Sequence, residues 1–248
     1  MARTSRRARR NSPFHLPIAF ELFTPSKEIV LNNIWIFGPL YAVPLIFYIH
    51  SWIWSPLPHQ SVHWWQHSDN LSPGWTGSTL PTYLTFLVVG FSLLWFIIIF
   101  AIGTIVQIMS QAAQLDAVEK KPLDFQDLWK IVKELGWRMF GLYITLAVIV
   151  VVGLLLLVIP GLIMIRRYIF APFIMLEKKT GIRESLDRSA DLSRLNTGSV
   201  WGLLGVMFLI SLVNIVPIIG GLASFALGAL YSVAPALRYQ QLKQLAAQ

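Results

Sequence analysis

Long apolar stretches alternate with short polar segments along this chain. Several stretches carry no charged residue over roughly 20 residues, which is the length that a helix needs to cross the hydrocarbon core of a bilayer. Isolated strands would leave backbone groups unsatisfied in lipid, and the alternating pattern of barrel strands is absent, so helices are predicted. The predicted spans cover residues 29–54, 82–108, 140–159, 161–176, 199–216 and 218–237.

Composition supports a membrane protein rather than a soluble domain with a large core. The chain has 248 residues, of which 55% are hydrophobic and 13% charged, whereas soluble domains carry about 25% charged residues. The predicted fold class is therefore all-α, a polytopic membrane helical bundle of six transmembrane helices with amphipathic interfacial helices. The chain has no cysteine, which excludes disulfides, thiolate metal ligands and a cysteine nucleophile.

Lysine and arginine placement predicts the orientation. The N-terminal arm and residues 111–138 and 177–198 are basic, whereas residues 55–81 contain no lysine or arginine. Six spans with both termini in the cytoplasm of a cell (inner) membrane satisfy this alternation. The expected organisation is a basic cytoplasmic arm (residues 1–26), a membrane domain (27–238) and a cytoplasmic tail (239–248).

The basic arm begins "MARTSRRARR" and is expected to stay on the mature chain, because no small-residue cleavage site follows the first span. It is interpreted as a topology determinant that lies on an anionic leaflet. Nucleic-acid binding is not expected, because the arm is short and no nucleic-acid-binding fold accompanies it.

A repeat is visible in the cytoplasmic segments. "EKKPLDFQDLWKIVKELGWRMFG" and "EKKTGIRESLDRSADLSRLNTGSVWGLLG" each precede a span, and "TPSKEIVLNNIWIFG" resembles a third copy. The pattern suggests a hairpin unit used three times. In the first copy Asp124 is a predicted helix cap. An apolar face with helical spacing follows it and is predicted to lie in the headgroup plane; it comprises Phe125, Leu128, Trp129, Val132, Leu135 and Met139.

Small residues recur every four positions in the sixth predicted span. Gly220, Ser224, Gly228 and Ser232 form one stripe on a helix, where another helix can approach closely. Packing within the bundle is the favoured interpretation of this stripe, and a contact between two copies of the chain is the alternative.

The outer loop "HQSVHWWQHSD" contains the only candidate metal ligands. His59, His63 and His67 are four residues apart and would align on a helix. The surrounding prolines favour a loop instead, and a structural site needs about four ligands. We therefore expect no bound metal and no cofactor.

Two adjacent arginines, Arg166 and Arg167, interrupt the fourth and shortest predicted span, so whether this segment crosses completely is left open. If Pro160 and Gly161 form the outer turn, Arg166 lies roughly 8 Å below it. Neighbouring residues on a helix point about 100° apart. We therefore predict that one arginine snorkels to lipid phosphate, while the other turns inward to helix-end carbonyls or an anionic headgroup. The alternative is that both arginines only snorkel.

The stretch "IPGLIMIRRYIFAPFIMLEKKTGIRESLDRSADLSR" resembles the glycerophosphodiester phosphodiesterase membrane-domain family and the related YciC-type bacterial membrane proteins. This resemblance covers about 40 residues and implies an integral membrane domain of largely uncharacterised role. No phosphodiesterase catalytic domain is expected here. The matching positions are Pro160, Gly161, Arg166 or Arg167, Ala171, Pro172, Glu177, Ser185, Leu186, Arg188 and Ser189.

The sequence favours a non-enzymatic integral membrane protein that interacts with lipid, anionic headgroups above all, or with another membrane protein. The first alternative is a transporter or channel subunit for a small or lipid-like anionic molecule. A lipid-modifying enzyme is the third hypothesis, but no acid pair, nucleophile motif or phosphate loop supports it.

Overall fold

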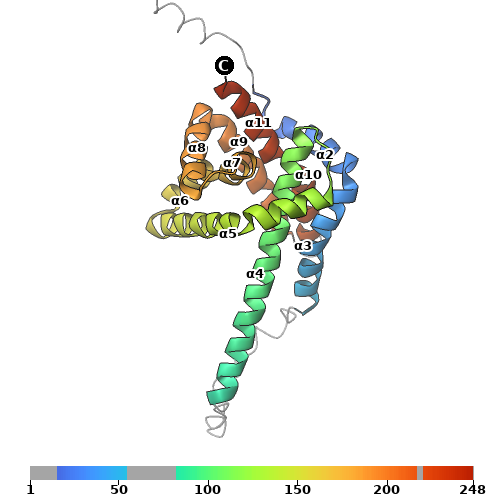
Figure 1. Cartoon of the computed structure of the whole chain (residues 1–248), viewed down its shortest axis with the longest axis vertical. Helices are drawn as coiled ribbons and strands as arrows, with labels where there is room; N and C mark the ends of the chain where they lie inside the picture. Colours follow the sequence, from blue (N-terminus) through green and yellow to red (C-terminus); the bar gives the residue numbers. More distant parts are fainter. Residues whose placement is uncertain (1–15, 55–81, 217–219, 248) are drawn as a thin grey trace, which may run out of the picture. The chain divides into compact units, whose positions relative to one another are not determined.

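The structure, a computed structural model, describes residues 16–54, 82–216 and 220–247, which are helices joined by short turns without any strand. The all-α class is confirmed. Five helical segments within these residues are long and apolar enough to cross a membrane, and a sixth is formed if one bent pair counts as a single span. The five are Leu93–Val118, Phe125–Leu156, Val158–Lys178, Thr197–Ile215 and Gly220–Ala246. The chain is a polytopic helical bundle (Figure 1).

The chain forms two compact units. Residues 42–106 form one unit, which holds the end of α3 (Ile34–Trp54) and the start of α4 (Thr82–Val118). The other unit comprises residues 1–41 and 107–248 and contains every site described below. Helix α4 runs ten residues beyond the predicted end of the second span, at 108.

The first predicted span, 29–54, contains a sharp bend. Helix α2 (Phe23–Asn32) and helix α3 meet at an angle of 99°. Asn33 lies at the bend, outside both helices, and its side-chain Nδ2 donates a 2.9 Å hydrogen bond to the Ile29 carbonyl at the end of α2. The Asn33 backbone N–H donates to the same carbonyl at 3.2 Å, so Asn33 closes the end of α2 with two hydrogen bonds. The two helices meet the length and hydropathy requirement for a membrane span only when they are taken together.

Helix α5 (Phe125–Leu156) joins the predicted interfacial helix and the third predicted span in one helix of 32 residues. Asp124 caps it as predicted, since the carboxylate accepts a 3.1 Å hydrogen bond from the Gln126 N–H. The predicted headgroup-facing side is wrong in part. Leu128, Val132, Leu135 and Met139 are buried within the protein, whereas Phe125 and Trp129 remain exposed.

The turn after α5 lies at Leu157, whose extended backbone separates α5 from α6 (Val158–Tyr168). The predicted turn at Pro160 and Gly161 is wrong, because both residues belong to the first turn of α6. Proline is tolerated there because its missing N–H would have no helical partner. Gly161 instead lets α5 and α6 approach, as a Cβ atom on Gly153 would lie 3.0 Å from the Gly161 Cα.

Helix α8 (Ile182–Leu195) follows α7 (Ala171–Lys178) and packs against α6 and α7 through a row of serines. Ser185, Ser189 and Ser193 recur every four residues and are fully buried. The hydroxyls of Ser189 and Ser193 donate to the Arg167 carbonyl at 2.9 and 3.5 Å. Small polar side chains thus bring α8 close to α6 while satisfying a backbone acceptor.

The sixth predicted span, 218–237, is divided. Helix α10 (Gly220–Tyr231) ends before Ser232, and α11 (Ala234–Ala246) includes most of the predicted tail, 239–248. Tyr239 and Leu242 of α11 are buried, so this segment belongs to the bundle. The small-residue stripe packs within the chain at three of its four positions. Gly220 faces the turn after α9 (Thr197–Leu212), Ser224 donates to the Ile210 carbonyl at 2.9 Å, and Ser232 contacts Tyr41, whereas Gly228 has open space around it.

The two returning helices break at matching positions. Helix α6 ends at Tyr168 and α7 begins with Ala171 and Pro172; α10 ends at Tyr231 and α11 begins with Ala234 and Pro235. The shared Tyr-x-x-Ala-Pro sequence explains the break, because a proline cannot donate to the preceding helical turn. The last two of the three suggested hairpin units therefore share a local structure as well as a sequence pattern.

Candidate anion-binding pocket

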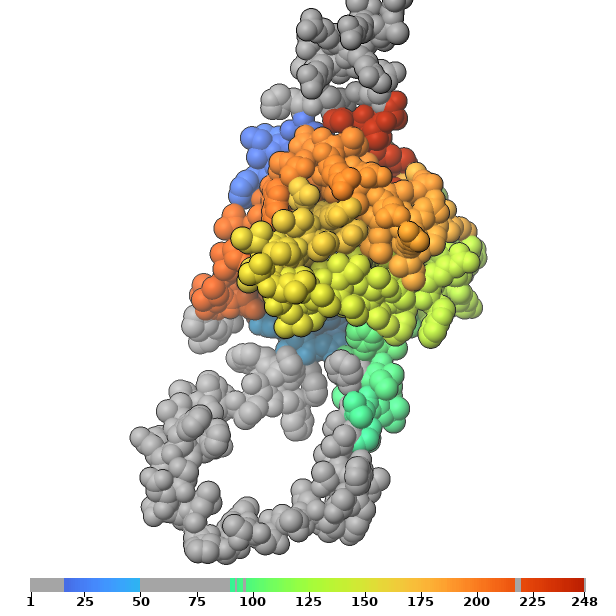
Figure 2. All heavy atoms as spheres, turned by 90° about the vertical axis from the view of Figure 1, so that its left-hand side faces the viewer, coloured from blue at the N-terminus to red at the C-terminus, as the bar shows by residue number. Residues whose placement is uncertain are grey.

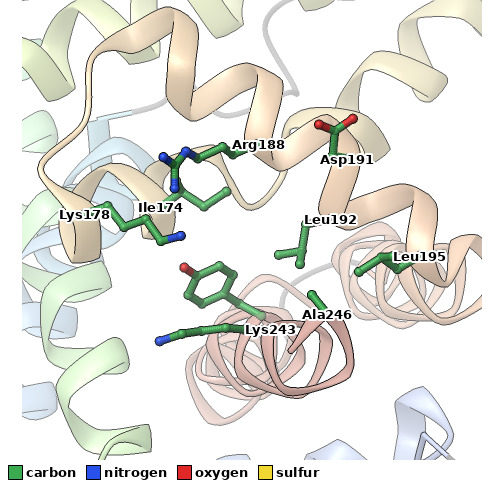
Figure 3. A pocket seen from close by; sticks show the side chains of 9 residues that line it. Ile174, Lys178, Arg188, Asp191, Leu192, Leu195, Lys243 and Ala246 are labelled. Atoms are coloured by element: carbon green, nitrogen blue, oxygen red, sulfur yellow. The ribbon is translucent and has the colours of Figure 1, made fainter. Parts of the chain in front are cut away.

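A pocket of about 340 Å³ lies where α7, α8 and α11 meet. Figure 3 shows three basic side chains, Lys178, Arg188 and Lys243, with their charged ends on one side of this pocket. The apolar side chains of Leu192, Leu195 and Ala246 lie on the other side. The lining residues are Ile174, Lys178, Arg188, Asp191, Leu192, Leu195, Tyr239, Lys243 and Ala246.

Each basic residue comes from a different helix. Lys178 is the last residue of α7, where the left-handed backbone of Lys179 (φ 51°) ends the helix. Arg188 lies in the middle of α8, and Lys243 lies in the last turn of α11. Asp191 also lines the pocket, but its carboxylate points away from the three cations in Figure 3.

Two of the three cations have carboxylate partners beside the pocket. Lys243 forms an ion pair with Glu177, and Arg188 pairs with Glu184 at 2.5 Å. Lys178 has no ion-pair partner among the described residues. The Arg188–Glu184 pair is about half exposed on both sides, and such pairs contribute about 0–1 kcal/mol. An incoming anion can therefore exchange with Glu184 at small cost.

Glu177 connects α7 to α11. Its Oε2 accepts a 2.5 Å hydrogen bond from the Tyr239 hydroxyl, and its Oε1 is bonded by Lys243. The Tyr239 ring stacks on Phe173 with centroids 6.0 Å apart. These contacts fix the floor of the pocket, so its cations are held by packed helices rather than by loops.

The arrangement suits a phosphate or carboxylate attached to an apolar group. Guanidinium and ammonium groups form strong charge-assisted hydrogen bonds with such anions. The wall formed by Leu192, Leu195 and Ala246 can contact hydrocarbon. In the described part of the chain, no three histidine, aspartate or glutamate residues are grouped so that they could hold a metal.

The structure places the predicted arginines outside this pocket. Arg166 and Arg167 are half-buried in the last turn of α6. The Nε atoms of both are buried without a hydrogen-bond partner among the described residues, so the two arginines do not differ at that atom. Because the turn is at Leu157, Arg166 lies nine residues beyond it, roughly 13 Å along the helix instead of 8 Å.

Four other predicted motif residues lie on α7 and α8, which form two sides of the pocket. Pro172 is buried in the first turn of α7, and Glu177 ends up beside Lys243. Arg188 lines the pocket, and the neighbouring Ser189 anchors α8 to α6. His59, His63 and His67 lie outside the described residues, so the absence of a bound metal stays a prediction.

Sequence reasoning missed Lys178, Tyr239 and Lys243 as site residues. Lys178 belongs to the quoted "EKK" repeat, and that repeat could have identified it as a candidate site residue. Tyr239 and Lys243 lay in or beside a predicted tail, and nothing in the local pattern indicated that α11 returns to α7 and α8.

Comparison of the chain with protein-family models, curated proteins and solved structures returned no match.

Proposed function

We propose that this chain is a non-enzymatic, multi-pass membrane protein that binds the anionic headgroup of a lipid in the pocket between α7, α8 and α11. The observation that carries the proposal is the convergence of Lys178, Arg188 and Lys243 from three helices opposite an apolar wall. A lipid presents this combination of a negative phosphate and hydrocarbon in one molecule. The anion would replace Glu184 at Arg188 and supply a partner for Lys178.

The proposed location is the cytoplasmic leaflet of the cell membrane. The basic residues of the pocket, Lys178, Arg188 and Lys243, lie in segment 177–198 and in the tail 239–248, which the positive-inside rule assigns to the cytoplasm together with both termini. The inner leaflet is rich in anionic lipids in many membranes, and each nearby basic residue contributes about 1 kcal/mol to the attraction.

The resemblance to the glycerophosphodiester phosphodiesterase membrane-domain family remains part of this proposal. Several motif residues make defined contacts around α7 and α8, which gives the motif a structural role: Pro172 opens α7, Glu177 binds α11, and Ser189 joins α8 to α6. A lipid-binding membrane domain is consistent with such a role and requires no catalytic group.

The test measures lipid preference in purified protein. The Lys178→Gln/Lys243→Gln double variant should lose the excess of phosphatidylglycerol over phosphatidylethanolamine that co-purifies with the parent, by several-fold. Lys130→Gln is the matched control, because Lys130 is an exposed lysine in an ion pair with Asp127 outside the pocket. Equal phosphatidylglycerol content in parent and double variant would refute the proposal.

A transporter or channel subunit for an anionic molecule is the second candidate. The helix breaks before Ala171 and Ala234 favour it, because discontinuous spans at corresponding positions of two repeats often form transport sites. Reconstituted vesicles separate the two functions. Transport requires release of a trapped phosphate or organic anion that depends on the protein, whereas lipid binding alone produces none.

A further inference from the structure

Arg238 is a fully buried cation outside the pocket described above. It lies on α11 with 0% of its surface exposed. Its Nη2 donates a 2.9 Å hydrogen bond to the Pro17 carbonyl, and its Nη1 donates a 3.0 Å bond to Oε1 of Gln241. Its Nε is buried and has no hydrogen-bond partner in the described part of the chain.

Both partners of this guanidinium are neutral. Among residues 16–54, 82–216 and 220–247, no carboxylate lies within the 4.0 Å that defines an ion pair with Arg238. An arginine stays charged under all ordinary conditions. A buried charge without a counter-ion is costly, whereas neutral hydrogen-bond partners only reduce that cost.

Arg238 lines a second pocket, of about 490 Å³, between the N-terminal segment and the start of α9. Figure 2 shows the blue N-terminal segment against the red C-terminal helix and the orange region of α8 and α9. Tyr231 also binds this segment by donating a 2.8 Å hydrogen bond to the Ala19 carbonyl. The lining residues are Leu16, Pro17, Ile18, Ala19, Phe20, Asn196, Gly198, Ser199, Gly202 and Arg238.

The first turn of α9 is a second source of positive potential in this pocket. Asn196, Gly198 and Ser199 all line it, and α9 is a 16-residue helix whose dipole is positive at this end. The Asn196 side chain accepts from the Ser199 N–H at 3.0 Å, which satisfies only one of the free N–H groups of the turn.

We propose that this pocket binds a phosphate-type anion, which acts as the counter-ion of Arg238 and is held at the N-terminus of α9. The anion is either a free phosphate or the phosphate of a lipid headgroup. Binding holds residues 16–20 between α9 and α11, because the same arginine bonds the Pro17 carbonyl. This site shares no lining residue with the pocket of α7, α8 and α11 and does not depend on the function proposed there.

Gly198 offers a variant that leaves Arg238 intact. Only Oδ1 of Asn196 lies within 4 Å of a Cβ added there, at 3.8 Å, and the glycine has no positive φ, so the backbone and the Cβ position accept a substitution such as Gly198→Asp. Because Gly198 and Arg238 line the same pocket, we expect the new carboxylate to occupy it and to act as an internal counter-ion of Arg238. Gly181→Asp is the matched control, since Gly181 precedes α8 at another helix N-terminus and a Cβ there meets nothing within 4 Å.

The experiment measures the thermal midpoint in detergent, with phosphate compared with chloride at equal ionic strength, and with phosphatidylglycerol compared with phosphatidylcholine. Phosphate at about five times its dissociation constant should raise the parent's midpoint by roughly 2–4 °C. The Gly181→Asp variant should respond in the same way. The Gly198→Asp variant should start from a higher midpoint than the parent in chloride and lose the response.

Both comparisons are repeated in the Lys178→Gln/Lys243→Gln background, so that lipid bound in the first pocket does not contribute. A response to phosphate there identifies a free anion as sufficient, and a response to phosphatidylglycerol alone identifies a lipid headgroup. The proposal is overturned if neither compound stabilises this background, or if Gly198→Asp responds as strongly as the parent. Either result leaves the lipid preference test of the first pocket unaffected.

Discussion

The hydroxyl of Tyr239 on α11 donates a 2.5 Å hydrogen bond to the Glu177 carboxylate at the end of α7. This bond joins two residues that are 62 positions apart in the chain, and it fixes the floor of the first pocket. Lys243 binds the other oxygen of the same carboxylate. Glu177 therefore joins both α11 side chains to α7.

Removal of the Tyr239 hydroxyl should destabilise the protein without collapsing the core. Tyr239→Phe keeps the ring stacked on Phe173 but loses a hydrogen bond to a charged group, so the free energy of unfolding should fall by about 1.5–3 kcal/mol. Tyr239→Ala also leaves a cavity and should cost about 3–5 kcal/mol. Denaturant unfolding in detergent would measure both. Equal stability of the phenylalanine variant and the parent would contradict the bond.

The close approach of α5 and α6 at Gly153 and Gly161 gives a second prediction. A Cβ atom at Gly161 would lie 2.6 Å from Cδ2 of Leu154 and 3.0 Å from its backbone nitrogen. Gly161→Ala should therefore lower the free energy of unfolding by about 1–3 kcal/mol through overpacking. The control is Gly205→Ala in α9, where an added Cβ meets nothing within 4 Å. That variant should be neutral or slightly stabilising.

The apolar spans could be predicted from sequence, because length without charge is a property of the local chain. The turn at Leu157 could not, since Pro160 fits both a turn and the first turn of a helix. The buried row on α8 escaped the hydrophobic pattern because Ser185, Ser189 and Ser193 are polar and become buried by bonding carbonyl groups.

The candidate site was predicted only in part, because some of its residues come together only through tertiary contacts. Glu177 and Arg188 were found through the family-like motif, which is continuous in the sequence. Lys243 and Arg238 depend on how α11 returns to α7, α8 and the N-terminal segment. That return is a tertiary contact between segments far apart in the chain. Neither residue stands out from ordinary solvated lysines and arginines in a sequence.

Topology can be tested with single cysteines, because the native chain has none. A cysteine at Ser68 should react with an impermeant reagent in intact cells, whereas a cysteine at Lys121 should react only after lysis. Lys121 is a good probe because 59% of its side chain is exposed. Ser185 is a poor probe because it is fully buried. A cysteine there would report how α8 packs and not on which side of the membrane the residue lies. Equal labelling at Ser68 and Lys121 in intact cells would refute the six-span orientation.

Arg166 and Arg167 carry the last prediction. Their buried Nε atoms have no hydrogen-bond partner among the described residues, and a buried donor without a partner costs about 1–3 kcal/mol. A change to leucine removes that cost, so it should be tolerated wherever the arginine has no further partner. The same change should lower the folded yield and the amount of co-purified anionic lipid wherever the guanidinium holds an anionic lipid headgroup.

We expect the two positions to behave differently, because adjacent side chains on α6 point about 100° apart and cannot share one path to the headgroups. One arginine should tolerate leucine in both folded yield and co-purified anionic lipid. The other should tolerate neither leucine nor lysine, since an ammonium group cannot reproduce the planar set of guanidinium donors. If both leucine variants match the parent in both measurements, neither arginine holds a lipid. The two buried Nε atoms would then only lower the stability of the folded protein.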